Sequence, residues 1–233
     1  MNRELLFKGL EKLGYIISEE KCEMLEKYSK MLVEWNEKMN LTSITDSDGI
    51  TIKHFLDSIV PIFTFNIEEG SKIIDVGTGA GFPGMPIKIV REDLKFTFMD
   101  SLNKRINFLK EVSGELGLKD AEFIHMRAEE GGKSQKYRQK YDFAVSRAVA
   151  PLKILSEYCI PFVKKGGIFA AFKSYDIDDE IKESKSMIGN LGGTVEDIKE
   201  VEIPFSDIKR KIILIRKEKD TPSQFPRKPN KIK

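Results

Sequence analysis

The sequence predicts an α/β protein with a mostly parallel sheet, an antiparallel last strand and a helical segment in front. Three observations lead to this fold class. From residue 72 onward, short β-branched runs alternate with segments of helical periodicity, the pattern of a parallel sheet. The first run, at 72–76, leads into a glycine-rich loop. The last two runs, at 194–203 and 211–217, are too close for a crossover helix, so we expect a hairpin.

The N-terminal part is expected to form a helical cap. Leucines recur on one face at 5–10, and a longer apolar face extends over 18–35. A polar break at 40–43 separates this helix from another that carries apolar residues at 52–59. The segment 1–68 is therefore predicted to be all-helical.

Residues 69–217 are expected to form one βα domain. Its strands share an enrichment in β-branched and aromatic residues, and its helices share an apolar face. The expected strands before the hairpin are 72–76, 95–100, 121–127, 141–146 and 168–173, and the expected helices are about 83–90, 102–116, 151–163 and 176–191.

Length and composition limit the class of protein. A chain of 233 residues can bury one sizeable core. No run of 18 apolar residues occurs, and the first residues mix charges with leucines, so we expect no membrane span or secretory signal and a cytoplasmic location. We also expect the protein to be a monomer. Cys22 and Cys159 stand alone, and His54 and His125 are the only histidines. No metal site is predicted.

The net charge of +2 conceals an uneven distribution. Residues 216–233 carry seven basic groups against two acids, with three prolines that disfavour a helix or central strand. The segment 218–233 is predicted to be a flexible basic tail that binds nucleic-acid backbone, with Arg227 and Lys228 as candidate RNA contacts. A second basic cluster lies at 133–140. Each cluster could equally be ordinary solvated surface.

The glycine-rich loop indicates a tightly held ligand. Gly77 and Gly79 allow backbone angles and close approaches that a Cβ would prevent. Asp75, just before the loop, would repel a pyrophosphate but attract an ammonium or sulfonium group. S-Adenosylmethionine has both groups. The pattern therefore predicts the cofactor loop of a Rossmann-like S-adenosylmethionine-dependent methyltransferase.

A dinucleotide is the main alternative ligand. The pattern G-x-G-x-x-G occurs at 79–84, but in dinucleotide folds its first glycine directly follows the strand. Here that residue is Gly77, and the third glycine would fall on Phe82. Asp100 ends the second strand, where an acid can bind ribose hydroxyls or cap the next helix. An NAD-dependent oxidoreductase and a tight turn without a ligand stay open.

The sequence at the end of the fourth strand limits which kind of atom could accept the methyl group. It reads Ser-Arg-Ala-Val-Ala-Pro at 146–151, not the Asn/Asp-Pro-Pro-aromatic motif used on exocyclic amines. Cys159 has no basic neighbour that would activate it for carbon-5 methylation of cytosine. A ring nitrogen such as guanine N7 loses no proton before attack. We therefore expect no general base, and catalysis by orientation and electrostatics.

Six segments together resemble a known family, the bacterial 16S rRNA guanine-N7 methyltransferase G family (RsmG, also called glucose-inhibited division protein B). The resemblance runs from about residue 20 to the end, although the C-terminal tail is shorter than usual. The segments are 35–42, 53–58, 75–84, 99–105, 127–129 and 146–150.

The resemblance implies methyl transfer from S-adenosylmethionine to N7 of a guanine in the 530 loop of 16S rRNA, guanine 527 in conventional rRNA numbering. Its partner would be 16S rRNA, the small ribosomal subunit or a precursor of it. A non-catalytic ribosome-assembly factor that retains the cofactor pocket is a further alternative. The implied cofactor contacts are Gly77, Phe82, Ala128, Glu129 and Arg147, to which the chemistry of the residues adds Asp75, Gly79 and Asp100.

Several charged residues remain to be assigned. Arg147 would be repelled by a sulfonium, so we expect it to meet the methionine carboxylate or an RNA phosphate. Arg105 and Lys173 are further candidate RNA contacts. His54 and Asp57 share a helical face with a serine, but neighbouring turns of one helix cannot hold a catalytic triad. We expect them to tie the cap to the sheet edge near the cofactor.

Overall fold

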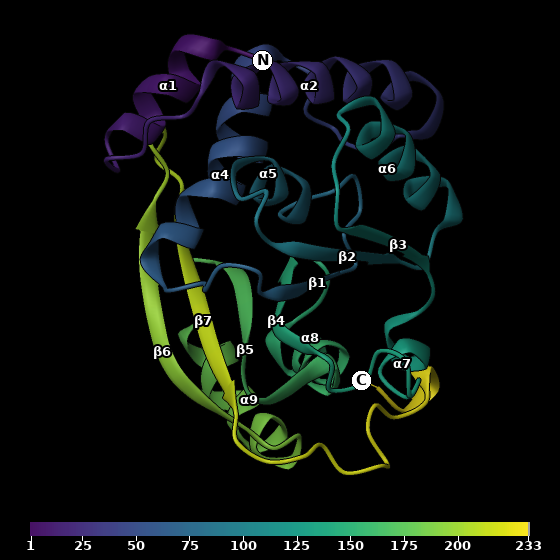
Figure 1. Ribbon diagram of the computed structural model, residues 1–233. Coiled ribbons are helices and arrows are strands. Elements are labelled where there is room, and N and C mark those ends of the chain that lie inside the picture. Colours follow the sequence, from purple (N-terminus) through teal and green to yellow (C-terminus); the bar gives the residue numbers. More distant parts are fainter. Residues whose placement is uncertain (233) are drawn as a thin grey trace.

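One seven-stranded sheet organises residues 1–232, the part of the chain that this computed structural model describes (Figure 1). The strand order is β3-β2-β1-β4-β5-β7-β6. Neighbours from β3 to β5 run parallel, whereas β7 is antiparallel to both β5 and β6. The predicted fold class, including its final hairpin, is confirmed. The strands are β1 (Lys72–Val76), β2 (Lys95–Asp100), β3 (Ala121–His125), β4 (Tyr141–Arg147), β5 (Val163–Ser174), β6 (Gly193–Glu202) and β7 (Lys209–Lys217).

Helical elements fill the N-terminal part and connect the strands. They are α1 (Arg3–Glu11), α2 (Glu19–Met39), α3 (Ser47–Gly49), η1 (Ile50–Leu56), α4 (Asp57–Ile59), η2 (Val60–Thr64), α5 (Gly84–Val90), α6 (Asn103–Glu115), α7 (Ala128–Gly131), α8 (Leu152–Cys159), η3 (Ile160–Phe162), α9 (Asp178–Asn190) and η4 (Pro229–Lys231). The helix expected at 151–163 ends at Cys159, because Pro161 lacks the N–H that would continue it. The short α7 was not predicted, since one turn shows no periodicity. No helix within residues 1–232 has the length and apolar character needed to cross a membrane.

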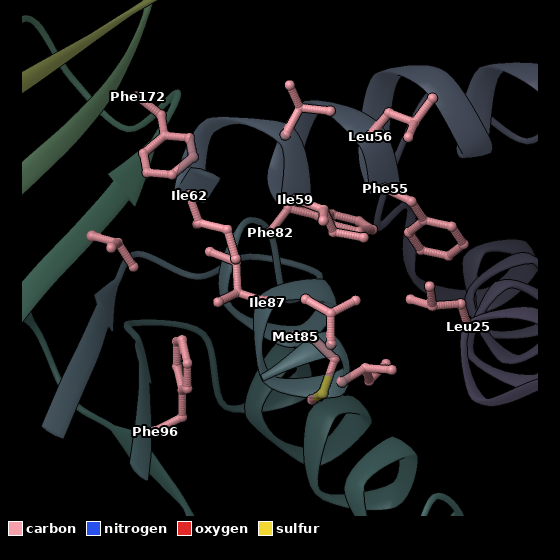
Figure 2. Close-up of a cluster of buried hydrophobic side chains, with 14 of the residues drawn as sticks. Leu25, Phe55, Leu56, Ile59, Ile62, Phe82, Met85, Ile87, Phe96 and Phe172 are labelled. Carbon is pink, nitrogen blue, oxygen red and sulfur yellow. The ribbon is translucent and has the colours of Figure 1, made fainter. Parts of the chain in front are cut away.

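Helices cover both faces of the sheet, because successive strand residues point to opposite sides. In β1, Ile73 belongs to one buried cluster and Ile74 to the other. The first cluster joins the sheet to α1, α2, α5 and α6, and the second joins it to α8 and α9. Figure 2 shows part of the first cluster, where Leu25 of α2, Phe55 of η1 and Met85 of α5 gather. The helical cap and the βα domain thus share one core.

The chain between α2 and β1 is irregular where a regular helix was expected at 52–59. Residues Ile50–Leu56 form a π-helix, followed by one α-helical turn and a 3₁₀ turn that contains Pro61. π-Helical turns are rare and are frequently found at functional sites. This one carries Lys53 and His54, which border the cavities described below.

The C-terminal segment packs against the body of the protein. After β7 the chain runs past the lower end of the sheet to lie beside α7 (Figure 1). Phe225 is buried, and Arg138 donates hydrogen bonds to the carbonyl oxygens of Thr221 and Phe225. Residues 218–232 therefore differ from the flexible tail that was expected, and Lys233 lies outside the described residues. The prolines of this segment correctly indicated an irregular backbone, but nothing in its composition indicated that the segment packs against the rest of the protein.

The basic cluster at 133–140 is also engaged within the protein. Lys136 pairs with Glu122 across 2.8 Å, and the Arg138 guanidinium is occupied by backbone carbonyls of the tail. Two of the cluster's four charges therefore serve internal contacts rather than a nucleic-acid surface.

Candidate functional site

A cavity of about 490 Å³ opens at the carboxyl ends of β1, β2, β3 and β4. Doubly wound sheets bind ligands at this edge, where the strand order reverses. Here β1 and β4 are neighbours although β2 and β3 lie between them in the chain. Seven of the eight predicted cofactor residues line the cavity, namely Gly77, Gly79, Phe82, Asp100, Ala128, Glu129 and Arg147.

Two glycines shape the floor of the cavity. Gly77 has φ +71° and its N–H donates to the Met99 carbonyl at 2.8 Å, which closes the turn after β1. A Cβ at Gly77 would lie 2.7 Å from Val149. Gly79 has φ +61°, and a Cβ there would meet nothing within 4 Å. Since Gly79 lines the cavity, this open space is where a ligand can lie directly on the backbone.

Asp75 is the one predicted cofactor residue that does not line the cavity. Its side chain is fully buried, and its Oδ2 accepts hydrogen bonds from Thr78 Oγ1 at 2.7 Å and from Gly84 N at 2.9 Å. Burial raises the pKa of Asp75 to about 7, although both hydrogen bonds oppose the rise. The expected attraction of this carboxylate to a cationic ligand is corrected accordingly: Asp75 supports the loop from behind.

Gly84 bears on the dinucleotide alternative. It is the third glycine of the G-x-G-x-x-G pattern, yet a Cβ there would lie 2.6 Å from Asp75 Oδ2 and 2.7 Å from Phe98, both in the core. Gly84 is needed for packing behind the loop. Close packing of helix and strand is also the role of the third glycine in dinucleotide folds, so this contact does not decide between the two ligands.

Asp100 connects the loop to the second strand. Its Oδ2 accepts from Gly79 N at 2.9 Å and lies 3.3 Å from Arg105 Nη1, while its Oδ1 accepts from Leu102 N at 2.9 Å. A carboxylate can accept about four hydrogen bonds, so Asp100 keeps capacity for a ligand hydroxyl. Arg105, predicted as an RNA contact, instead lines the cavity beside Asp100.

An aromatic platform forms the wall between the cap and the loop. The Phe82 ring stacks on His54, with centroids 4.3 Å apart and planes 14° from parallel, and Figure 2 shows Phe82 beside the helical segment that carries Phe55 and Ile59. His54 Nε2 pairs with Thr42 Oγ1 at 2.8 Å. Burial, reinforced by nearby Arg147, lowers the pKa of His54 to about 4. The ring is therefore neutral at physiological pH.

A buried charge cluster ties the cap to the sheet edge, as was expected for this helical face. Asp57 Oδ2 accepts from Arg147 Nη1 at 2.9 Å, and Asp57 Oδ1 accepts from Arg210 Nε at 2.7 Å. Asp57 is 3% exposed and Arg147 is 13% exposed. Two guanidinium groups share one carboxylate, so the cluster keeps a net positive charge. Burial lowers the pKa of Arg147, which nevertheless stays charged.

The wall opposite the cap comes from α7 and α8. Ala128 and Glu129 begin α7, and Tyr158 lies in α8. Next to Tyr158, the fully buried Glu157 receives Arg227 of the tail, whose Nη2 and Nε lie 2.7 and 3.0 Å from Oε2. Arg227, predicted as an RNA contact, therefore holds the tail against this wall.

The remaining predicted RNA residues lie elsewhere. Lys173 Nζ is 2.5 Å from Glu180 and donates to the Ala150 carbonyl, and Lys173 lies outside the cavity lining. Lys228 is exposed. Within residues 1–232 no three His, Cys, Asp or Glu side chains are arranged to hold a metal ion.

Sequence reasoning missed several residues that line the cavity. Leu41 and Thr42 follow α2, His54 comes from the π-helix, and Tyr158 comes from α8. His54 was singled out, but as a link between cap and sheet. Its neighbour in the cavity, Thr42, lies in the segment 35–42 that resembles the family. That resemblance was a signal of a binding role, whereas the residue types alone supplied none.

The arrangement suits an extended nucleoside with a charged end. The loop offers exposed backbone, Asp100 offers acceptors for hydroxyl groups, and apolar surface comes from Phe82, Met99 and Met126. Ordinary ligand pockets have volumes of about 300–1,000 Å³, so one such molecule would fill this cavity.

Comparisons with known proteins agree with this geometry. A family model described as rRNA small subunit methyltransferase G matches residues 21–213. The Ribosomal RNA small subunit methyltransferase G of Alkaliphilus metalliredigens is 50% identical over 98% of this chain and 95% of its own length. The protein of the same name from Thermoanaerobacter sp. (strain X514) is 47% identical, with the same two coverages of 98% and 95%.

Solved structures share the fold at low sequence identity. A SAM-dependent methyltransferase from Aquifex aeolicus is 21% identical with a TM-score of 0.53, covering 76% of this chain and 96% of that one. M. jannaschii TYW2, solved in complex with AdoMet, is 12% identical with a TM-score of 0.53, covering 74% and 77%.

Proposed function

The chain belongs to the rRNA small subunit methyltransferase G family, and from this we propose that it methylates N7 of a guanine in 16S rRNA. Membership supports the coarser activity, methylation of small-subunit rRNA with S-adenosylmethionine as the cofactor. The proposal adds the atom and the position, which is a guanine of the 530 loop, guanine 527 in conventional rRNA numbering. We further propose that the protein acts as a cytoplasmic monomer.

One observation carries the proposal. The segments that resemble the family are scattered over the chain, from the polar break after α2 to the end of β4, yet their residues meet around one cavity. Thr42, Gly77, Asp100, Ala128 and Arg147 come from five separate segments. A resemblance that reflected only a shared core would not gather at a single opening in the surface.

The cavity residues fit S-adenosylmethionine. Gly79 leaves room for the ligand against the backbone, Asp100 retains acceptors for ribose hydroxyls, and Glu129 with its neighbours on α7 borders the far end. When bound, S-adenosylmethionine supplies a methyl group on a positively charged sulfur, which a ring nitrogen can accept without first losing a proton. Phe82 would give the cationic donor an aromatic face.

The titratable groups of the cavity suit an acceptor that needs no general base. Asp100 is held by the backbone and by Arg105, and His54 is stacked on Phe82 and paired with Thr42. These groups orient and exclude water. In well-aligned systems, correct orientation of the reactants alone lowers the activation free energy by roughly 7–11 kcal/mol.

Methyl transfer to rRNA tests the proposal. Purified protein would be incubated with labelled S-adenosylmethionine and with 16S rRNA, small subunits or precursor particles that lack N7 methylation. Borohydride reduction and aniline cleavage then locate 7-methylguanine at nucleotide resolution. We expect cleavage at guanine 527 on at least one of these substrates.

Other outcomes separate the alternatives. Cleavage at another guanine would overturn the position, and label on another atom would overturn N7. No incorporation on any assembly state, together with retained binding of S-adenosylhomocysteine, would indicate an assembly factor without catalysis. Tight binding of NAD with no response to S-adenosylhomocysteine would indicate the oxidoreductase.

A further inference from the structure

A second cavity of about 430 Å³ adjoins the donor cavity on the side of β5 and β7. The two cavities share three lining residues, His54, Arg147 and Ala148. The second is otherwise walled by η1 and by the ends of β5 and β7, with Lys53, Lys173 and Arg210 among its lining residues. Two pockets of ligand size therefore meet at one wall.

The second cavity carries more positive charge than its acids balance. Four cations and one carboxylate line it: Lys53, Arg147, Lys173, Arg210 and Asp57. Asp57 is shared by Arg147 and Arg210, and Glu180 pairs with Lys173 from outside the lining. Within residues 1–232 no salt bridge joins Lys53, whose side chain is exposed. This excess of positive charge favours an anion.

The shared wall shows backbone strain. Ala148 directly follows β4 and has φ +56°, a left-handed conformation that costs a non-glycine residue roughly 1–2 kcal/mol. Such strain persists where the surroundings impose it and clusters at active sites. Here it turns the chain between the two cavities, immediately after Arg147.

The volumes and the chemistry together indicate the occupant. A donor molecule fills the first cavity, and a methyl acceptor must bring its reacting atom to about 3–3.5 Å from the methyl carbon. The acceptor therefore has to reach the shared wall from outside the donor cavity. An RNA base attached to a phosphate matches what the second cavity offers, since enzymes that modify a base draw it out of the stack into a pocket.

We propose that the second cavity is the acceptor-nucleotide site, in which Lys53 and Arg210 bind an RNA phosphate while the attached base extends past Arg147 to the donor cavity. This inference rests on the proposed function and specifies where its substrate binds. Lys53 supplies a mobile point charge at the entrance. Arg210 is fixed by Asp57 and offers its remaining donors in a set direction.

Lys53 gives the sharpest test, because its replacement leaves the Asp57 cluster intact. We would compare the full-length wild type with Lys53→Gln and with Lys185→Gln. Lys185 is another exposed lysine, on α9 and outside the lining of either cavity, and its loss changes the net charge by the same amount. Affinity for a 16S rRNA fragment that contains the 530 loop is measured against salt, with the protein saturated with S-adenosylhomocysteine.

We expect Lys53→Gln to bind the RNA roughly tenfold more weakly than Lys185→Gln. The slope of log affinity against log salt should fall by about 0.7, the value for one phosphate contact on a single strand. Affinity for S-adenosylhomocysteine should be equal in all three proteins. Equal slopes for the two variants, or no binding of the RNA by the wild type, would overturn the site.

These outcomes separate the inference from the proposed function. The function is judged by methyl incorporation, and the site is judged by RNA binding. Wild type that binds the RNA through Lys53 but incorporates no methyl group would retain the site and refute the function. If the wild type methylates guanine 527 but Lys53→Gln binds the RNA as tightly as Lys185→Gln does, the proposed function stands and the proposed acceptor site is refuted.

Discussion

Replacing Arg227 by alanine should loosen the wall of the donor cavity from a distance. Arg227 reaches from the tail to Glu157, whose side chain is fully buried in α8. The Arg227 backbone N–H donates to the same carboxylate at 2.6 Å. The segment just before it is in contact with α7, since a Cβ at Gly132 would lie 2.7 Å from Pro226. The tail thus closes over α7 and α8 (Figure 1).

The magnitude follows from the burial of the two partners. Removing one partner of a buried ion pair costs about 3–5 kcal/mol, because the other charge is left without compensation. Arg227 is 33% exposed whereas Glu157 is fully buried, so we take the lower value, about 3 kcal/mol. For a chain of this size, that loss lowers the unfolding midpoint by roughly 6–12 °C.

The assay combines stability with ligand binding. Thermal and urea unfolding would be measured for Arg227→Ala and for Lys228→Ala, the neighbouring exposed residue, and calorimetry would give the affinity of each for S-adenosylhomocysteine. We expect Lys228→Ala to stay within about 0.5 kcal/mol of wild type. Arg227→Ala should also bind the ligand more weakly, because Ala128, Glu129 and Tyr158 line the cavity on the elements that the tail covers.

A second substitution separates loss of the ion pair from general damage. In the Arg227→Ala background, Glu157→Gln removes the buried charge and should restore about 1–2 kcal/mol. If Arg227→Ala behaves like Lys228→Ala, or if Glu157→Gln brings no recovery of stability, then the tail does not hold this wall of the cavity in place.

Three further predictions concern the loop and the platform. Asp75→Asn should bind S-adenosylhomocysteine with an affinity within about threefold of wild type but should lose roughly 1–2 kcal/mol of stability, because this carboxylate supports the loop from behind. A loss of affinity above tenfold would indicate that Asp75 contacts the ligand directly. Gly79→Ala should weaken S-adenosylhomocysteine binding measured by calorimetry, since its Cβ would enter the cavity from a left-handed residue. Gly114→Ala, at an open position in the last turn of α6, should instead stabilise the fold by up to about 0.5 kcal/mol. Burial lowers the pKa of His54 from 6.5 to about 4, so between these pH values the unfolded state binds a proton that the folded state does not. The free energy of unfolding should therefore decrease by at most about 3 kcal/mol as the pH falls from 6.5 to 4. In urea titrations His54→Gln should show a smaller decrease than wild type, and an identical pH profile would contradict the shift.

Much of the fold could be predicted because the periodicity of the apolar residues and the positions of the turn residues indicate the same element boundaries. The β-branched run at 72–76 and the glycines after it placed β1 and its loop correctly, and the short gap before 211–217 predicted the antiparallel pair. The failures share a cause. The π-helix Ile50–Leu56 has helical composition but a wider turn, and α7 is one turn long, so neither produces a periodic signal of its own.

The charged residues were harder to assign because their roles depend on partners distant in the chain. Asp75 was expected to face the ligand because it precedes the loop, but its contacts with Thr78 and Gly84 turn it inward. Arg227 was expected to bind RNA because its segment is basic, yet Glu157, 70 residues away in the chain, takes its charge. The net charge of a segment counts its charged side chains but does not show which of them are already paired with an opposite charge elsewhere in the fold.

The two cavities also explain why a buried charge cluster stands between them. Asp57 is costly to bury alone, and Arg147 and Arg210 offset that cost from two different strands. An apolar contact could join the cap to the sheet equally well, but it would leave no net charge at the shared wall. Because the cluster retains one uncompensated positive charge, the contact that fixes the helical cap also favours an anionic acceptor beside the donor cavity. Asp57→Asn should therefore reduce stability, because two buried guanidinium groups lose their shared partner. It should not weaken the electrostatic attraction of RNA, because the wall then carries one more uncompensated positive charge. Lys53→Gln should do the opposite, lowering RNA affinity and leaving stability unchanged.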